Sequence, residues 1–190
     1  MSAAEQLKTT YAEYLALELS SGVRHEFVDG FAYAMAGGEP EHARLALAIG
    51  AELRSLLRGV PCRVFSSDLK VRVPASGNAY YADAAVVCGP LARDDDDPLA
   101  VTNPTMLVEV LSPSTERFDR GEKFADYRLF ASLQHYVMVT VGRRRIEHYR
   151  RNLDGTWTLT VATTGEGIAL PEYGGRLAVD DVYEGDDAVG

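Results

Sequence analysis

Three charged side chains stand where their neighbours predict a buried sheet and the helix that packs on it. Glu109 is the one charge in the apolar run 106–111, and Asp83 lies between two tyrosines and another apolar run. Lys123 shares one face of a helix predicted over 119–131 with aromatic residues. Burying an ionised group costs several kcal/mol unless it is paired or binds a metal ion. The pattern therefore indicates two acids and a lysine that form one site.

The chemistry these residue types offer is metal-assisted attack on a phosphate. Two carboxylates on neighbouring strands supply the hard oxygen ligands that Mg²⁺ or Mn²⁺ binds together with a phosphate. Without a cation, one of two adjacent carboxylates has its pKa raised, so a metal ion is a natural partner. The alternative is structural: Lys123 extends to solvent, or it pairs along its helix with Asp119 or Tyr127.

The elements that must position these side chains follow from hydrophobic periodicity and turn residues. Their order predicts a mixed α/β or α+β domain with a central sheet. Helices are predicted over 10–20, 40–58 and 119–131. Strands are predicted as a hairpin turning at Asp29-Gly30, at 63–65, 69–73, 80–87 and 106–111, and as an antiparallel meander over 135–162.

The 190 residues contain no internal repeat or linker, which predicts one domain over 1–190 with a tail that frays from about 181. The N-terminal stretch has no apolar run of signal-peptide or membrane-spanning length. Cys62 and Cys88 have no CxxC spacing and are interpreted as small core residues. Together these features predict a cytoplasmic protein that does not bind membranes.

The net charge of −9 and the pI of about 4.9 have the wrong sign for an obvious nucleic-acid binder. Part of the excess is the acidic run 94–97, interpreted as a solvated loop. Asp68 and Lys70 either extend the rim of a metal site or, more simply, face solvent. The basic stretch 142–151 either follows a phosphate backbone or forms an exposed hairpin, and its arginines are Arg143, Arg144, Arg145, Arg150 and Arg151.

The order of several motifs resembles a known family. RHEFVDG, EHARLALAIGAELRSLL, YYADAAVV, VEVLSPST and DRGEKFADYRLF, followed by QHYVMV, are similar to the Uma-type family of putative restriction endonucleases. That family is a bacterial group within the PD-(D/E)XK nuclease superfamily, and the resemblance spans roughly 11–151. It implies a restriction-endonuclease-like core: a central mixed sheet flanked by helices, with an added antiparallel meander.

The resemblance also implies roles for the three charged residues. Asp83 matches the aspartate of the PD motif, although Ala82 stands where proline is usual. Glu109 matches the acid of (D/E)XK, but Leu111 occupies the lysine position, so Lys123 on the following helix becomes its counterpart. The metal ligands implied are Asp83, Glu109 and the main-chain carbonyl of Val110.

Further residues are assigned around this centre. Glu26, in the predicted hairpin, matches the upstream glutamate of the family, and Glu52 is a rival because it lies near the buried face of the second helix. His42 lies beside the same face and either touches substrate or is a core histidine. Tyr127 would support Lys123.

These assignments predict a Mg²⁺- or Mn²⁺-dependent endonuclease that hydrolyses phosphodiester bonds in DNA. One alternative is a non-catalytic nucleic-acid-binding or structural protein with the same fold, and another is a hydrolase of small phosphoesters. A homodimer is expected, because two-fold related sites suit cleavage of both strands.

Overall fold

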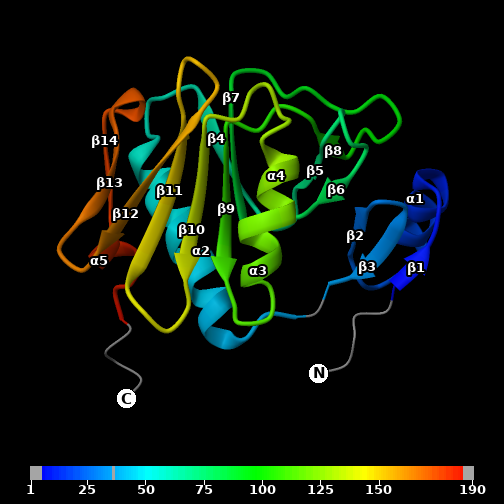
Figure 1. Ribbon diagram of the computed structural model, residues 1–190, viewed down its shortest axis with the longest axis horizontal. Coiled ribbons are helices and arrows are strands. Elements are labelled where there is room, and N and C mark those ends of the chain that lie inside the picture. Colours follow the sequence, from blue (N-terminus) through cyan, green and yellow to red (C-terminus); the bar gives the residue numbers. More distant parts are fainter. Residues whose placement is uncertain (1–5, 36, 186–190) are drawn as a thin grey trace.

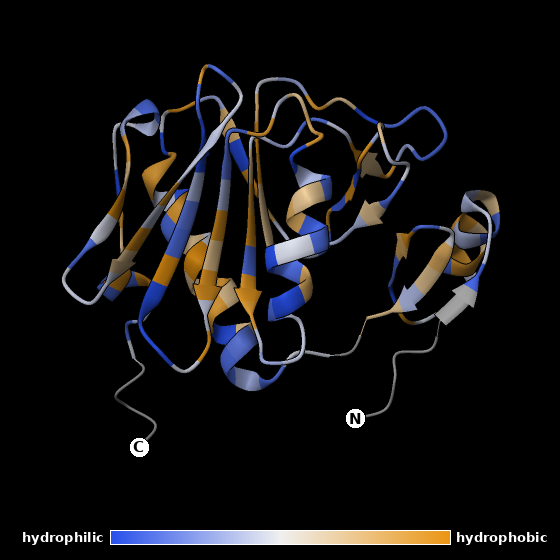
Figure 2. Ribbon diagram, in the orientation of Figure 1, coloured by the Kyte–Doolittle hydropathy of each residue, from blue (hydrophilic) through white to orange (hydrophobic). Residues whose placement is uncertain are grey.

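The computed structural model describes residues 6–35 and 37–185, which form layers of sheet and helix (Figure 1). The larger part is a six-stranded central sheet with helices on both faces, and a second six-stranded sheet lies beside it with the N-terminal helix. Figure 2 shows hydrophobic residues in the central strands and along the helix behind them, and hydrophilic residues in the outer loops. None of the helices in the described residues is long and apolar enough to span a membrane.

The central sheet has the strand order β12-β11-β10-β9-β7-β4. β9 and β10 pair in parallel, whereas the other neighbours pair antiparallel. The predicted mixed central sheet and the antiparallel meander of β10, β11 and β12 are thus confirmed. The strands are β4 (Cys62–Ser66), β7 (Ala84–Cys88), β9 (Met106–Leu111), β10 (His135–Thr140), β11 (Arg145–Arg151) and β12 (Trp157–Thr163).

One face of the central sheet packs against α2 (Pro40–Leu56). Proline occupies the first helical turn, where its missing N–H costs no hydrogen bond. Leu45, Ile49 and Leu53 recur every four residues and are fully buried against the β9 face that carries Val108. The predicted helix and its buried face are confirmed.

The opposite face carries a helical segment built of three pieces. α3 (Glu116–Phe118) leads into a π-helical turn, η1 (Asp119–Lys123), which continues as α4 (Phe124–Tyr127). A single regular helix over 119–131 was predicted, so the segment starts earlier, is wider in its middle and ends sooner than expected. Asp119 and Lys123, the end residues of the wide turn, are both buried toward the sheet.

Aromatic rings fill the space between this segment and the sheet. The rings of Phe124 and Tyr136 stack with 4.8 Å between centroids, and Tyr127 meets Tyr80 edge to face at 5.3 Å. Alternation in β9 places Glu109 on this aromatic side of the sheet, as the sequence predicted.

The second sheet has the order β1-β3-β2-β6-β5-β8. Its hairpin turns at Asp29 and Gly30, whose φ angles of 51° and 81° fit the turn predicted there. α1 (Tyr11–Ser20) starts at the side-chain cap of Thr10 and packs on this sheet through Tyr14. The strands are β1 (Gln6–Lys8), β2 (His25–Val28), β3 (Phe31–Ala34), β5 (Lys70–Arg72), β6 (Ala79–Tyr80) and β8 (Ala100–Val101).

The strand predicted over 80–87 is in fact two strands that belong to different sheets. β6 ends at Tyr80 in the second sheet, and β7 begins at Ala84 in the central sheet. Between the two strands, the Asp83 carboxylate accepts the N–H of Val110. If β7 continued, one of its own residues would pair with Val110 instead. The crossing therefore brings an acid to the point where the two sheets meet.

The interpretation of 94–97 as a solvated loop is wrong for two of its acids. Asp97 is buried and binds the buried Lys70 ammonium, with 2.8 Å between Nζ and Oδ2. Asp94 binds Arg72, which also stacks on Tyr11. Lys70 consequently neither faces solvent nor extends a metal site, because its charge is neutralised inside the second sheet.

The basic stretch is mostly bound within the protein. Glu147 is buried and pairs with Arg145 and with Arg120 of the π-helical turn. Arg151 donates to main-chain carbonyls and lies over Trp157. The internal partners of these side chains reduce their availability for a phosphate backbone.

The two cysteines are joined, contrary to the interpretation that both are simple core residues. Cys62 and Cys88 are directly opposite in the register of β4 and β7 and form a disulfide. Both lie at the margin of the core, where β4 is the edge of the central sheet. The spacing of 26 residues gave no signal, because strand register decides which cysteines meet.

The C-terminal part continues as β13 (Gly167–Leu170), β14 (Gly175–Ala178) and α5 (Val179–Val182), packed on the α2 side of the sheet. Tyr183 is buried, and the main-chain carbonyls of Thr140 and Arg145 share the one hydrogen of its hydroxyl. The prediction that the tail frays from about 181 is wrong for 181–183, and residues 186–190 lie outside the described residues.

We expect Leu53→Ala to lower the free energy of unfolding by about 2–5 kcal/mol, because it leaves a cavity between α2 and the sheet. Leu47→Ala is the matched control on the same helix, since Leu47 is 76% exposed, and it should change stability by no more than about 0.5 kcal/mol. Urea unfolding measures both variants. Equal losses from the two substitutions would contradict the packing of α2 described here.

Candidate active site

The ammonium group of Lys123 lies among carboxylates that come from three elements. Its Nζ is 3.0 Å from Oε1 of Glu26 on β2 and 3.0 Å from Oε1 of Glu109 on β9. Asp119, at the start of the π-helical turn, is 3.8 Å away. The side chain of Lys123 is 6% exposed, so the pairs form away from bulk water. The structure thus joins Glu26, Glu109 and Lys123 in one cluster.

Asp83 approaches the same strand from the crossing between the sheets. Its Oδ2 accepts the main-chain N–H of Val110 at 2.7 Å and lies 3.3 Å from Nε2 of His42. The negative charge of Asp83 acts on Glu109, the neighbour of Val110. The two acids predicted from the sequence are therefore both placed at the C-terminal half of β9, and His42 adjoins Asp83 from the N-terminal turn of α2.

Neighbouring groups hold the acids in place. The hydroxyl of Tyr127 donates to Oε1 of Glu109 at 2.8 Å, and the N–H of Tyr81 donates to Oε1 of Glu26 at 3.2 Å. Tyr136 donates to the main-chain carbonyl of Asp119 at 2.9 Å. These bonds fix the carboxylates before any ligand arrives.

The charges of the cluster strongly shift one another. Burial raises the pKa of Glu109, Lys123 opposes this, and Asp119, Asp83 and Glu26 reinforce it, so the pKa lies well above its ordinary value. Burial lowers the pKa of Lys123, but Glu109, Glu26 and Asp119 outweigh it and hold the ammonium charged. The cluster retains more carboxylates than cations.

His42 is also favoured in its charged form. A hydrogen bond to Asp83 raises its pKa, burial opposes this, and a backbone hydrogen bond to Val110 adds to the rise.

The structure does not bring Glu52 to this cluster. It lies ten residues beyond His42 on α2, about 15 Å along the helix axis, and no ion pair or hydrogen bond of Glu52 is found within the described residues. Of these two candidates, Glu26 is the one that contacts Lys123. Asp119 was expected only as a partner for Lys123 on the helix, but it joins the cluster through the four-residue spacing that had been noticed. The contact of the Tyr81 N–H had no signal in the sequence.

The donor set is suited to a hard cation, although it is not a preformed cage. Within the described residues, no three His, Cys, Asp or Glu side chains converge tightly enough to form a ready metal cluster. Asp83, Glu109 and the Val110 carbonyl nevertheless carry oxygen atoms of the kind that hard cations bind, and a divalent cation would relieve the excess negative charge of the site. The residues present fit Mg²⁺ or Mn²⁺ on these grounds.

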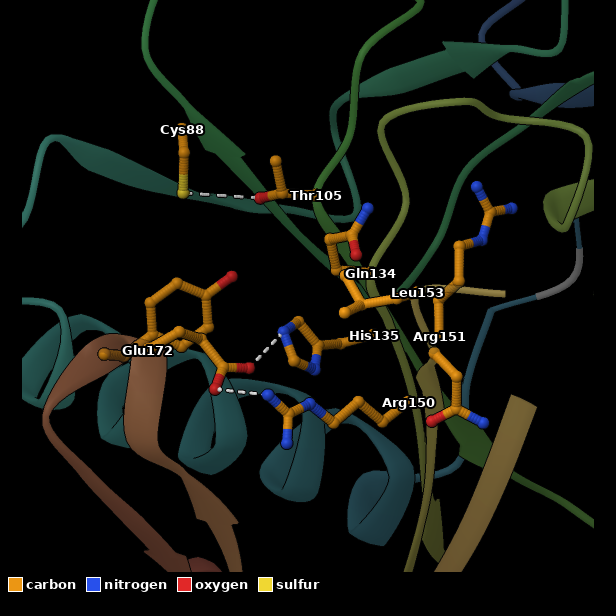
Figure 3. A pocket seen from close by; sticks show the side chains of 10 residues that line it. Cys88, Thr105, Gln134, His135, Arg150, Arg151, Leu153 and Glu172 are labelled. Carbon is orange, nitrogen blue, oxygen red and sulfur yellow. Dashed lines mark hydrogen bonds and ion pairs between the residues drawn. The ribbon is translucent and has the colours of Figure 1, made fainter. Parts of the chain in front are cut away.

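A cavity of about 480 Å³ lies elsewhere, beside the start of β10 (Figure 3). His135 and His148 share a hydrogen bond of 2.9 Å there, and Nε2 of His135 is 2.7 Å from Glu172 on the 3-10 helix η2 (Pro171–Tyr173). Burial lowers the pKa of both histidines to about 4, so both are neutral at pH 7. Their strand positions place them on the sheet face opposite Glu109, which separates this cavity from the acidic cluster.

Comparison with known proteins agrees with this geometry. The model of the Uma2 family, described as "Putative restriction endonuclease", matches residues 11–178. An uncharacterised Synechocystis protein, slr1290, is 35% identical over 94% of this chain and 93% of its own length. A second, sll1609, is 33% identical over 80% of this chain and 85% of its own.

A solved structure shares the fold. The crystal structure of a putative nuclease belonging to DUF820, from Anabaena variabilis, superposes with a TM-score of 0.73 over 92% of this chain and 97% of that one. At 14% sequence identity this likeness concerns the fold alone. The restriction-endonuclease-like core expected from the sequence is thereby confirmed.

Glu109→Gln should raise the free energy of unfolding at neutral pH, because the amide keeps the acceptor for Tyr127 and removes a disfavoured buried charge. Because the pKa of Glu109 is raised in the folded protein, its protonated carboxyl is the form that favours folding. This contribution is complete below the pKa of the carboxyl in the unfolded chain and is lost as pH rises through its pKa in the folded protein. The gain of the variant, on the order of 1 kcal/mol, should therefore fade below about pH 4.

Urea unfolding from pH 4 to pH 8 measures this difference. Glu122→Gln is the control, since Glu122 is exposed one residue before Lys123, and its effect should be small at every pH. A loss of stability in Glu109→Gln at pH 8 would show that the ionised carboxylate is the favoured form.

Proposed function

The chain belongs to the Uma2 family of putative restriction endonucleases, and from this premise we propose that it is a metal-dependent endonuclease that hydrolyses phosphodiester bonds in DNA. The observation that carries the proposal is the convergence of Glu26, Glu109 and Lys123, with Asp83 on the adjoining main chain. These residues come from separate elements, and burying their charges together has a cost that a structural role alone does not explain.

Asp83, Glu109 and the main-chain carbonyl of Val110 would hold Mg²⁺ or Mn²⁺. When bound, such a cation lowers the pKa of a coordinated water and neutralises charge on the phosphate. Asp83 is aimed by the Val110 N–H at 2.7 Å, and Glu109 by the Tyr127 hydroxyl at 2.8 Å. The main chain of Val110 and the buried ring of Tyr127 thus hold the two carboxylates that would bind the metal ion.

Lys123 supplies a permanent positive charge at the reacting phosphate. Its pKa is raised by three carboxylates, so it acts as a cation and a hydrogen-bond donor rather than as a base. It would orient the attacking water and stabilise negative charge on the phosphate oxygens. Glu26 holds the ammonium from the opposite side and would bind a second cation or its water shell.

DNA binding by this protein has to be local, because the whole chain carries a charge of −9. We extend the proposal to a cytoplasmic homodimer, in which two-fold related sites would cut both strands. The disulfide removes the argument for a reducing compartment that free cysteines had provided, so the cytoplasmic location rests on the proposed DNA substrate.

The second candidate is a nucleic-acid-binding or structural protein with the same fold and no turnover. One observation favours it: Lys123 already neutralises part of the acidic cluster, and no ready three-ligand metal cluster occurs in the described part of the chain. Metal binding without cleavage of any nucleic acid would support this candidate.

The leading proposal predicts that the wild-type protein nicks plasmid DNA and cuts single-stranded DNA only with Mg²⁺ or Mn²⁺. Asp83→Asn and Glu109→Gln should each lower the rate by about 100-fold or more, because each removes a charged metal ligand. Asp95→Asn is the control, since it makes the same charge change on an exposed loop residue and should keep the rate. Cleavage at the wild-type rate by both site variants would rule out this active site.

A further inference from the structure

His42 lies beside Asp83, one of the residues proposed to bind the metal ion. Its Nε2 is 3.3 Å from Oδ2 of Asp83, the oxygen that accepts the main-chain N–H of Val110. The side chain of His42 is 22% exposed and that of Asp83 is 16% exposed, so the ring reaches into the site from its rim. The carboxylate that His42 contacts is thus one of the groups that would bind the cation.

The position of the ring is determined by the chain before α2. A Cβ added at Gly38 would lie 2.9 Å from Nδ1 of His42, closer than such atoms approach one another. A glycine at this position therefore lets the loop pass directly over the ring. With Nδ1 against this loop, Nε2 is the nitrogen directed at Asp83.

The spacing of these donors matches a coordination shell. With metal–ligand bonds of about 2.0–2.2 Å, neighbouring donors lie about 3.0–3.4 Å apart. The 3.3 Å between Nε2 and Oδ2 falls in this range. In the structure, the ring occupies this position as a hydrogen-bonding partner, which compensates one carboxylate of an acid-rich site.

We infer that His42 is a ligand of the metal ion, adding an imidazole nitrogen to the oxygens of Asp83, Glu109 and Val110. This inference rests on the metal site of the proposed function and deepens it. Imidazole suits first-row transition metals, whereas Mg²⁺ prefers oxygen ligands alone. The site therefore selects Mn²⁺ and related transition-metal ions over Mg²⁺.

The test measures metal binding directly, with the full chain and without DNA. Titration calorimetry should show that the wild-type protein binds Mn²⁺ about 10-fold or more tightly than Mg²⁺. His42→Ala should weaken Mn²⁺ binding about 10-fold or more and change Mg²⁺ binding much less. Gly38→Ala retains the imidazole but displaces it, so it should weaken Mn²⁺ binding by a smaller factor. Thermal melting checks that each variant is folded.

A spectroscopic measurement identifies the ligand itself. In the imidazole ¹⁵N spectrum, titration with diamagnetic Zn²⁺ should shift Nε2 of His42 while His135 and His148, in the separate site beside the start of β10, keep their signals. Asp83→Asn should abolish the shift, because the pair of donors is then broken.

The outcomes separate this inference from the proposed nuclease activity. Asp83-dependent metal binding with an unshifted His42 signal overturns the inference and leaves the nuclease proposal standing. A shifted His42 signal in a protein that cleaves no nucleic acid supports the inference and contradicts the nuclease proposal. A wild-type protein that binds neither Mn²⁺ nor Zn²⁺ overturns both.

Discussion

The burial of the Lys123 ammonium among carboxylates is the interaction on which the rest of the structure depends. A charge in this position is tolerated because Glu26 and Glu109 reach it at 3.0 Å and Asp119 lies just beyond, so Lys123 keeps charged partners when one of these acids is neutral. These acids belong to the second sheet, the central sheet and the helical segment. The ion cluster therefore fixes the relative positions of these three parts. Apolar side chains in the same place would not fix them.

The aromatic layer around the cluster makes this arrangement specific. Tyr80 and Tyr127 place their rings 5.7 and 5.9 Å from the Lys123 nitrogen, and the Tyr127 hydroxyl binds Glu109. The rings exclude water, which strengthens each charge pair and raises the cost of leaving any acid unpaired. Each further carboxylate in the cluster lowers the stability of the fold and would strengthen the binding of a cation. Stability is given up where chemistry is expected.

The crossing between the two sheets supplies the other half of the site. The residues between β6 and β7 end at Asp83, which continues neither strand. Its carboxylate accepts the N–H of Val110 in place of a partner on a neighbouring strand. One short segment thus ends a sheet and presents an acid that contacts both the Val110 N–H and the ring of His42. The same strand, β7, ends at Cys88 in the disulfide with β4, which ties the edge of the sheet to its interior.

Local patterns in the sequence were sufficient for the elements and for part of the site. Alternation in 106–111 placed Glu109 opposite the face of Val108, and the Asp29-Gly30 turn identified the hairpin. Helical spacing put Lys123 and Tyr127 on one face, because two neighbouring turns determine which side chains align. Periodicity depends only on residues that are close together in the chain, so a single sequence is enough to show it.

Only the tertiary structure decided which distant groups meet. The choice of Glu26 over Glu52, the pairing of Lys70 with Asp97 and the disulfide all join residues far apart in the chain. Each of these contacts depends on strand register and on how the two sheets pack against each other. Packing of the whole core determines both, and the local pattern of residues does not encode them. The sequence therefore determined which residues carry charge into the core, and the fold decided which opposite charge each one meets, because a buried charge is stable only beside its partner.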